Sequence, residues 1–232
     1  TAIIMGGGSV DIRTEEEILA DNLSAALPSG DKFTKLFLAE VVEGIDAIYV
    51  AENKAGYVCV VGEQFIGVDA NGTVLTEGVD NAENITNAVD KVKSTTYKEI
   101  DLSSYPDLAS YVLSARKTAT GNYVVETKGA GYGIKGGNEY HPASNEYIIV
   151  RVSMTNDNKI IDCLTVSQAE TKGIGDVCAN ESFYKQFVGK TQTDYNDVDA
   201  ISGATMTTDG YKQAVKRAFD TVNALKGGGN NE

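Results

Sequence analysis

A tight turn that leads into a helix is encoded by residues 199–208, which read Asp-Ala-Ile-Ser-Gly-Ala-Thr-Met-Thr-Thr. Ser202 and Gly203 are turn formers, and glycine takes a positive φ at little steric cost. The threonines that follow are good helix N-cap residues. A glycine run ends the helix at residues 227–229. Between these limits, apolar residues recur at the three-and-four spacing of one buried helical face: Tyr211, Val215, Ala218, Val222 and Leu225.

Thr205 is predicted to lie just before the N-terminus of this helix. The unpaired backbone N–H groups and the dipole of a helix favour an anion such as a phosphate at that end. Ala204 has no bulk that would block a ligand. The stretch therefore predicts a hydroxyl group beside an anion site.

Residues 202–205, Ser-Gly-Ala-Thr, with Asp199 three residues earlier, resemble the flavinylation motif of the FMN-binding domain family, which includes RnfG- and NqrC-type subunits. In that family the last threonine forms a phosphoester with FMN, so the resemblance implies covalent FMN at Thr205. It also implies a separate flavin transferase, with Asp199 serving recognition by that enzyme or a metal ion during transfer. The backbone N–H groups expected to face the phosphate are those of Met206, Thr207 and Thr208.

A second block upstream is Glu170-Thr171-Lys172-Gly173-Ile174-Gly175, which follows an apolar run and reads as a loop. Its glycines let the backbone approach a ligand closely, and its first two residues offer a carboxylate and a hydroxyl. Family members have Glu-Thr-Pro-Gly-Ile/Leu-Gly here, so Lys172 stands in place of proline and could pair with a phosphate or a reduced flavin anion. The resemblance implies that this loop sets the polar contacts of the flavin ring, whereas the block alone reads equally as a surface turn.

Weaker candidates lie in a glycine-rich loop at residues 129–142, which the resemblance places near the flavin. They are Tyr132, Tyr140 and His141, of which the histidine reads more simply as a loop residue. Lys190 reads either as a phosphate ligand or as a solvated lysine. No catalytic residue and no metal ligand is expected.

Composition narrows the class of protein. The 232 residues suit one large domain or two small ones, and the net charge of −13 argues against nucleic acid and anionic lipid as partners. Three cysteines without C-x-x-C spacing and one histidine argue against a zinc site. Cys59 and Cys163 are predicted to be core residues and Cys178 to be more exposed, with a Cys163–Cys178 disulfide left open.

The fold class predicted is α+β, with mixed, mostly antiparallel sheets and packed helices. Thr14 is expected to cap a helix that ends at Pro28. The other elements expected are strands between 33 and 74 with a hairpin at Asn71-Gly72, helices at 84–93 and 106–116, a strand pair at 147–154 and 159–166, and a short helix at 183–188.

The chain also resembles itself, because Tyr49–Tyr57 matches Tyr123–Tyr132 with one residue inserted. Each copy is expected to supply a hairpin with a glycine turn, and two unrelated hairpins are the alternative. Loosely duplicated halves follow from this. The expected organisation is a disordered lead at 1–12, an FMN-binding domain at 13–226 with halves at 33–120 and 121–226, and a flexible tail at 227–232.

The function expected is an electron-transfer flavoprotein domain of RnfG type, a carrier rather than a complete enzyme. Its expected partners are the other subunits of a membrane electron-transport complex and the flavin transferase. The resemblance places it outside the cytoplasm, anchored by an N-terminal helix absent from this chain. The alternatives are a non-redox module that binds FMN or another ligand, and the flavin module of a larger extracellular reductase. No G-x-G-x-x-G follows a strand, which argues against a complete NAD- or FAD-dependent enzyme.

Overall fold

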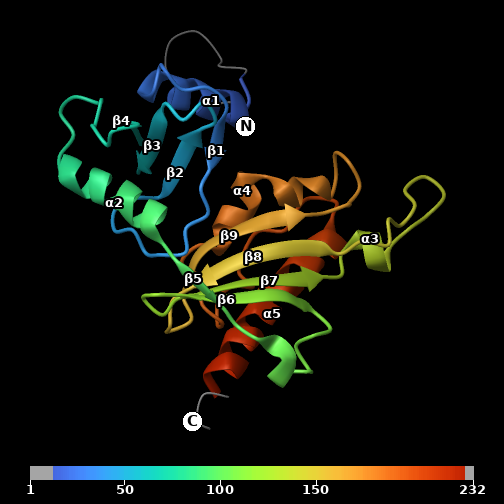
Figure 1. Ribbon diagram of the computed structural model, residues 1–232. Helices are drawn as coiled ribbons and strands as arrows, with labels where there is room; N and C mark the ends of the chain where they lie inside the picture. Colours follow the sequence, from blue (N-terminus) through green and yellow to red (C-terminus); the bar gives the residue numbers. More distant parts are fainter. Residues whose placement is uncertain (1–12, 228–232) are drawn as a thin grey trace. The chain divides into compact units, whose positions relative to one another are not determined.

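The computed structural model describes residues 13–227 (Figure 1). The predicted lead at 1–12, and residues 228–232 of the predicted tail, lie outside the described residues. The fold class is α+β with two antiparallel sheets, as predicted. Within the described range, we find no helix with the length and apolar character needed to cross a bilayer.

The chain divides into two compact units. The first unit comprises the described chain up to Leu36 together with Val42–Lys93. The second unit comprises Phe37–Val41 together with the chain from Ser94 onward. The short segment Phe37–Val41 belongs to the second unit because its backbone is held there: Leu38 donates its N–H to Asp162 and accepts the Ser153 hydroxyl.

The first unit is a four-stranded antiparallel sheet with two helices. Its strands lie in the order β1 (Phe33–Lys35), β2 (Ala47–Ala51), β3 (Gly56–Val61) and β4 (Gln64–Asp69), and its helices are α1 (Glu15–Ala26) and α2 (Ala82–Ser94). The predicted cap of α1 is a full capping box, in which Thr14 and Glu17 each accept the other's backbone N–H. A Cβ on Gly67 would lie 1.9 Å from the Ala26 carbonyl oxygen, so only glycine lets α1 lie this close to β4.

The second unit is a five-stranded antiparallel sheet in sequence order. Its strands are β5 (Tyr97–Glu99), β6 (Val112–Thr118), β7 (Tyr123–Gly129), β8 (Ile148–Met154) and β9 (Ile160–Ser167). Its α-helices are α3 (Tyr132–Lys135), α4 (Glu181–Tyr184) and α5 (Thr205–Gly227), and its 3₁₀ turns are η1 (Leu102–Ser104), η2 (Asp176–Ala179) and η3 (Lys185–Phe187).

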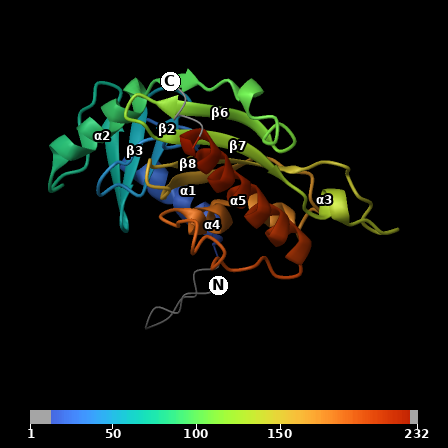
Figure 2. The same ribbon diagram turned by 90° about the horizontal axis from the view of Figure 1, so that it is seen from below.

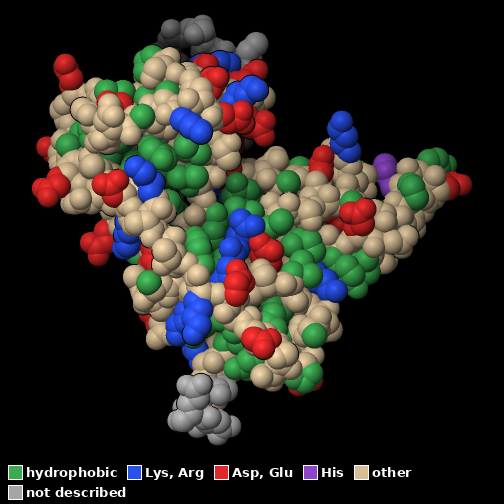
Figure 3. Space-filling view, in the orientation of Figure 1, with side chains coloured by type: hydrophobic (Ala, Val, Ile, Leu, Met, Phe, Trp, Pro, Cys, Tyr) green, Lys and Arg blue, Asp and Glu red, His purple; other side chains and the backbone are tan. Residues whose placement is uncertain are grey.

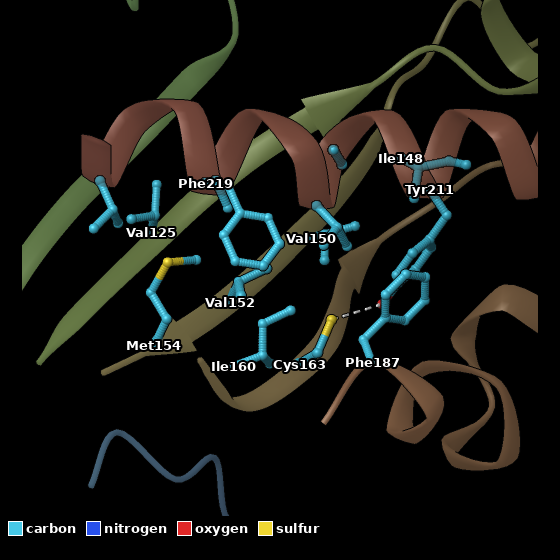
Figure 4. Close-up of a cluster of buried hydrophobic side chains, with 14 of the residues drawn as sticks. Val125, Ile148, Val150, Val152, Met154, Ile160, Cys163, Phe187, Tyr211 and Phe219 are labelled. Atoms are coloured by element: carbon cyan, nitrogen blue, oxygen red, sulfur yellow. Dashed lines mark hydrogen bonds between the residues drawn. The ribbon is translucent and has the colours of Figure 1, made fainter. Parts of the chain in front are cut away.

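Helix α5 covers one face of this sheet, as Figure 2 shows from below, and packs chiefly on β7 and β8. All five predicted core positions of α5 are buried. Figure 4 shows Tyr211 and Phe219 pointing from α5 toward the side chains of β8 and β9. Tyr211 also stacks on Phe187 with ring centroids 5.3 Å apart. This core fixes α5, and therefore its N-terminus, against the sheet.

Three predictions about local structure are wrong. Residues 106–116 do not form a helix, since η1 and a turn precede β6, which starts at Val112 and pairs with both β5 and β7. The second copy of the internal repeat forms no hairpin, because β7 runs on into α3 at Tyr132. Cys178 is fully buried rather than exposed, and all three cysteines are free thiols. At Asn71-Gly72, where a hairpin was predicted, the chain turns back and pairs with β4 through one isolated β-bridge, between Val68 and Val74.

Candidate functional site

The two sequence blocks meet in the second unit, at the start of α5. Residues 201–204 form a β-turn in which the Ala204 N–H bonds the Ile201 carbonyl at 3.0 Å. Gly203 has a φ of 74°, the left-handed conformation that the third residue of a type II turn requires. Helix α5 begins directly after this turn, so Thr205 is its first residue rather than the residue before it.

Three threonines follow the turn, and the structure gives their hydroxyl groups different surroundings. Thr207 and Thr208 are buried, with 1% and 2% of their surface exposed. Thr207 donates to Glu170, and Thr208 donates to the Ala204 carbonyl. The side chain of Thr205 is exposed, and its hydroxyl makes no hydrogen bond within residues 13–227. Thr205 is therefore the threonine of this group whose oxygen a reagent can reach.

The N-terminus of α5 also presents backbone donors. The N–H groups of Thr205, Met206 and Thr207 have no partner in the described part of the chain. The N–H of Thr208, which we expected to face the phosphate, bonds the Ala204 carbonyl at 3.0 Å instead. An anion at this helix end would therefore meet three amide groups and the positive end of a 23-residue helix.

Glu170 joins three segments of the second unit. Its Oε2 accepts the Tyr132 N–H at 2.8 Å and the Thr207 hydroxyl at 2.5 Å, and its Oε1 accepts the Gly133 N–H at 3.0 Å. The residue is 7% exposed, and a buried carboxylate is tolerated when its oxygens are hydrogen-bonded. Glu170 therefore caps α3 and holds the first turn of α5, and both of its oxygens face the protein.

The rest of the second block is a compact loop. The Thr171 carbonyl accepts N–H groups from Ile174 at 3.1 Å and from Gly175 at 2.9 Å. Gly173 has a φ of 76° and donates its N–H to Asp176 at 2.8 Å. These bonds close the loop although Lys172, which is exposed, replaces the proline of the family pattern.

A cleft of about 340 Å³ lies between the two blocks. Its volume is at the lower end of the range of small-molecule sites, and its lining mixes apolar and polar side chains as such sites do. Asp199 is fixed at its edge by an N–H bond of 2.9 Å to Gln186. The lining residues are Gly173, Ile174, Val177, Ser182, Phe183, Gln186, Asp199, Ala200, Ile201 and Ser202.

Comparison with known proteins agrees with this geometry. Residues 145–220 match the FMN-binding domain family, and this range contains both sequence blocks. Residues 145–220 are therefore similar to an FMN-binding domain. The resemblance to this family that the sequence motifs indicated is confirmed.

The chain also has a named relative. The chain is 32% identical over 115 residues to an RnfG-type component of the proton-translocating ferredoxin:NAD(+) oxidoreductase complex of Clostridium ljungdahlii. The match covers 46% of this chain and 56% of the length of that component. The similarity therefore extends over about half of each protein.

The residues of the candidate site fit FMN in three respects. Among the residues that the structure describes, the first N–H groups of α5 have no partner and can meet a phosphate, and the Thr205 hydroxyl at the same point has none either. The adjoining cleft offers Ile174, Val177 and Phe183 as apolar surface for a flat ring. FMN, when bound, would supply the redox chemistry, and these residues would supply binding and orientation.

The weaker sequence candidates lie outside the lining of this cleft. The Tyr132 hydroxyl donates to the His141 carbonyl at 2.7 Å, which closes the loop after α3. Tyr140 is 80% exposed, and the single histidine of the chain is visible at the surface in Figure 3. Lys190 forms an ion pair with Asp194, in which Nζ lies 3.9 Å from Oδ2.

Several residues of the candidate site were not identified from the sequence. Val177, Phe183 and Gln186 line the cleft, but their spacing reads only as a short amphipathic helix. The N–H groups of Tyr132 and Gly133 bind Glu170 through the backbone, which leaves no trace in residue type. The only available signal was the glycine-rich composition of residues 129–137.

Proposed function

We propose that this FMN-binding domain carries FMN as a phosphoester on Thr205 and relays electrons as an RnfG-like subunit of a membrane electron-transport complex. The observation that carries the proposal is the exposed Thr205 hydroxyl at the start of α5, which has no hydrogen-bond partner among residues 13–227 and lies three residues after Ser202 of the cleft lining. The neighbouring hydroxyls of Thr207 and Thr208 are buried and engaged, so they are excluded as acceptors.

The attachment reaction follows from the chemistry of a hydroxyl and a pyrophosphate. Thr205 Oγ1 bonds to the phosphorus of the FMN half of FAD, while the bond from that phosphorus to the bridging oxygen breaks. AMP leaves with the bridging oxygen, and the hydroxyl proton is released to solvent. A flavin transferase supplies the catalytic groups and any metal ion, with exposed Asp199 available for its recognition.

The residues of the chain then hold the product in place. The N–H groups of Thr205, Met206 and Thr207 face the phosphate, and exposed Lys172 is available to pair with negative charge. The cleft residues Ile174 and Phe183 cover the ring, and their polarity influences which redox states are stable. No proton-transferring side chain is needed, because the domain carries electrons and does not transform a substrate.

The proposed setting is the outer face of a cell membrane. The relative from C. ljungdahlii is named as part of a proton-translocating ferredoxin:NAD(+) oxidoreductase complex, and we extend membership of such a complex to this chain. The other subunits of the complex and the flavin transferase are the proposed partners. An N-terminal helix outside this sequence is the proposed anchor.

The test is co-expression of the chain with a flavin transferase, followed by intact mass, peptide mapping and a visible spectrum. The expected product is one FMN less one water, on Thr205, with Thr205→Ala unlabelled. Ser202→Ala is the matched control, because Ser202 is the other exposed hydroxyl of the motif and lines the cleft. Label that persists in Thr205→Ala and disappears in Ser202→Ala would overturn the assignment. A labelled protein whose flavin cannot be reversibly reduced would favour the non-redox binding module.

A further inference from the structure

We infer that Thr208 is a positioning residue for the attachment of FMN to Thr205. Its hydroxyl fixes the conformation of the turn at residues 201–204, which ends directly before the acceptor. The inference rests on the function proposed above. The Thr208 side chain is buried, does not line the cleft, and makes no hydrogen bond to the Thr205 hydroxyl, so it would act through the turn.

The Thr208 hydroxyl makes two hydrogen bonds with opposite roles. It accepts the Ile201 N–H at 3.0 Å and donates its proton to the Ala204 carbonyl at 3.1 Å. These two groups belong to the first and last residues of the β-turn. One side chain, one helical turn beyond the acceptor, therefore ties both ends of the turn to α5.

The two middle residues of the turn are not packed in the core. Ser202 and Gly203 are exposed, and a Cβ on Gly203 would meet nothing within 4 Å. The side chain of Lys212 holds the chain before the turn and does not contact the turn itself. Its Nζ donates to the carbonyls of Asn196 and Val198 at 2.8 and 3.1 Å. The end residues Ile201 and Ala204 are buried in the core, and the Thr208 bonds fix their backbone groups relative to α5.

A restrained acceptor matters because group transfer needs the attacking oxygen in line with the phosphorus. Misplacement of a reacting group by about 1 Å can cost roughly 100-fold in rate. Thr207 does not share this role, since its hydroxyl donates to Glu170 and not to the turn. At the same helix end, Thr207 therefore binds the Glu170 loop, whereas Thr208 binds the turn at residues 201–204.

The test compares Thr208→Val with Thr221→Val in the full chain. Thr221 is a buried residue of α5 whose hydroxyl donates to the carbonyl four residues earlier, Arg217, as Thr208 does to Ala204. It makes no bond to the turn, so it controls for loss of a buried hydroxyl. We expect Thr208→Val to lower kcat/KM for flavin transfer from FAD by about 10- to 100-fold. Thr221→Val is expected to stay within about twofold of the wild type, because it leaves the turn intact.

A second measurement does not depend on the transferase. Backbone hydrogen exchange at Ile201 should be protected in the wild type and in Thr221→Val, and lost in Thr208→Val. Thr208→Ser keeps the hydroxyl and should restore both exchange protection and transfer rate. Should Thr208→Val fail to fold, Thr208→Cys keeps the volume with a weaker donor and should show the same losses to a smaller degree.

Two results would overturn the inference: equal transfer rates in Thr208→Val and Thr221→Val, or unchanged exchange at Ile201 in Thr208→Val. Failure of the proposed function has a different signature. In that case the wild-type chain itself remains unlabelled by a transferase that labels a known acceptor.

Discussion

The hydroxyl of Thr207 donates a hydrogen bond of 2.5 Å to Oε2 of Glu170 and thereby joins the first turn of α5 to the loop after β9. The same carboxylate accepts the N–H groups of Tyr132 and Gly133 at the start of α3. One buried side chain therefore organises three segments that are far apart in the sequence. The second motif block acts on the site through this contact as well as through the cleft.

Replacing Glu170 with glutamine should destabilise the second unit. The amide keeps the volume but puts an NH₂ group where an oxygen now accepts, so one backbone N–H loses its partner. We expect a loss of about 1–3 kcal/mol in the free energy of unfolding, the cost of an unsatisfied buried donor. Urea unfolding measures it, with Glu139→Gln on the exposed loop after α3 as the neutral control.

A double-mutant cycle with Thr207→Val isolates the contact between the two side chains. Residues that share a hydrogen bond show coupling energies of about 0.5–3 kcal/mol, whereas independent residues show additive effects. We expect Glu170→Gln and Thr207→Val to be coupled in this range. Strictly additive losses would mean that the two side chains stabilise the unit independently.

The two glycines of the second block should respond differently to substitution. A Cβ on Gly175 would lie 2.6 Å from Thr207 Oγ1 and 2.9 Å from Glu170 Cβ, whereas one on Gly173 would meet nothing within 4 Å. We expect Gly175→Ala to cost about 1–3 kcal/mol through overpacking. Gly173→Asn should cost less than about 1 kcal/mol, because asparagine tolerates the left-handed backbone. Thermal unfolding of both variants checks the order, and a reversed order would contradict this account of the loop.

The buried thiols should be unreactive in the folded protein. Burial raises the pKa of Cys59 to about 12, and it raises the pKa of Cys178 to about 12 with a further push from the nearby Glu170 and Asp176 charges. Because the folded-state pKa lies above the unfolded value of 9.0, the folded state is favoured below pH 9 and loses stability as the pH rises above it. We expect no labelling of these two cysteines by iodoacetamide at pH 8, and full labelling in urea. Rapid native labelling of Cys178 would instead show an open loop around the site.

The sequence predicted the elements that depend on local patterns. The apolar stripe of α5, the helix cap at Thr14 and the strand pair around Asn158 are all short-range signals, and the structure contains each of them. The two motif blocks were assigned to one site by resemblance, and the cleft lined by Ile174 and Ser202 brings them together.

Features that depend on residues far apart in the sequence could not be predicted from local sequence patterns. Val112 and Leu113 fit a helix or a strand equally, and pairing with β5 and β7 decides for β6. The burial of Cys178 depends on packing in the core beneath α5, which a glycine-rich neighbourhood does not reveal. The roles of Thr207 and Thr208 depend on Glu170 and Ile201, so adjacent identical residues acquire different functions only in the folded chain.

The cleft itself can be tested through Ile174, which is 38% exposed and lines it. If the flavin ring packs there, Ile174→Asp should weaken the binding of free riboflavin by about tenfold, or ~1.4 kcal/mol, since the ring loses apolar surface and meets a charge. Val188→Asp is the matched control, because Val188 is an apolar residue with similar exposure, 42%, that does not line the cleft.

Both substitutions are at exposed positions, so each should change the free energy of unfolding by less than about 0.5 kcal/mol. In the flavinylated protein, Ile174→Asp should also raise flavin fluorescence by exposing the ring to water, and Val188→Asp should not. Equal riboflavin affinity and equal fluorescence in the two variants would show that the ring lies elsewhere, even if Thr205 carries the phosphate. Attachment at the start of α5 and ring binding in the cleft are thus separable, and the pair of aspartate variants separates them.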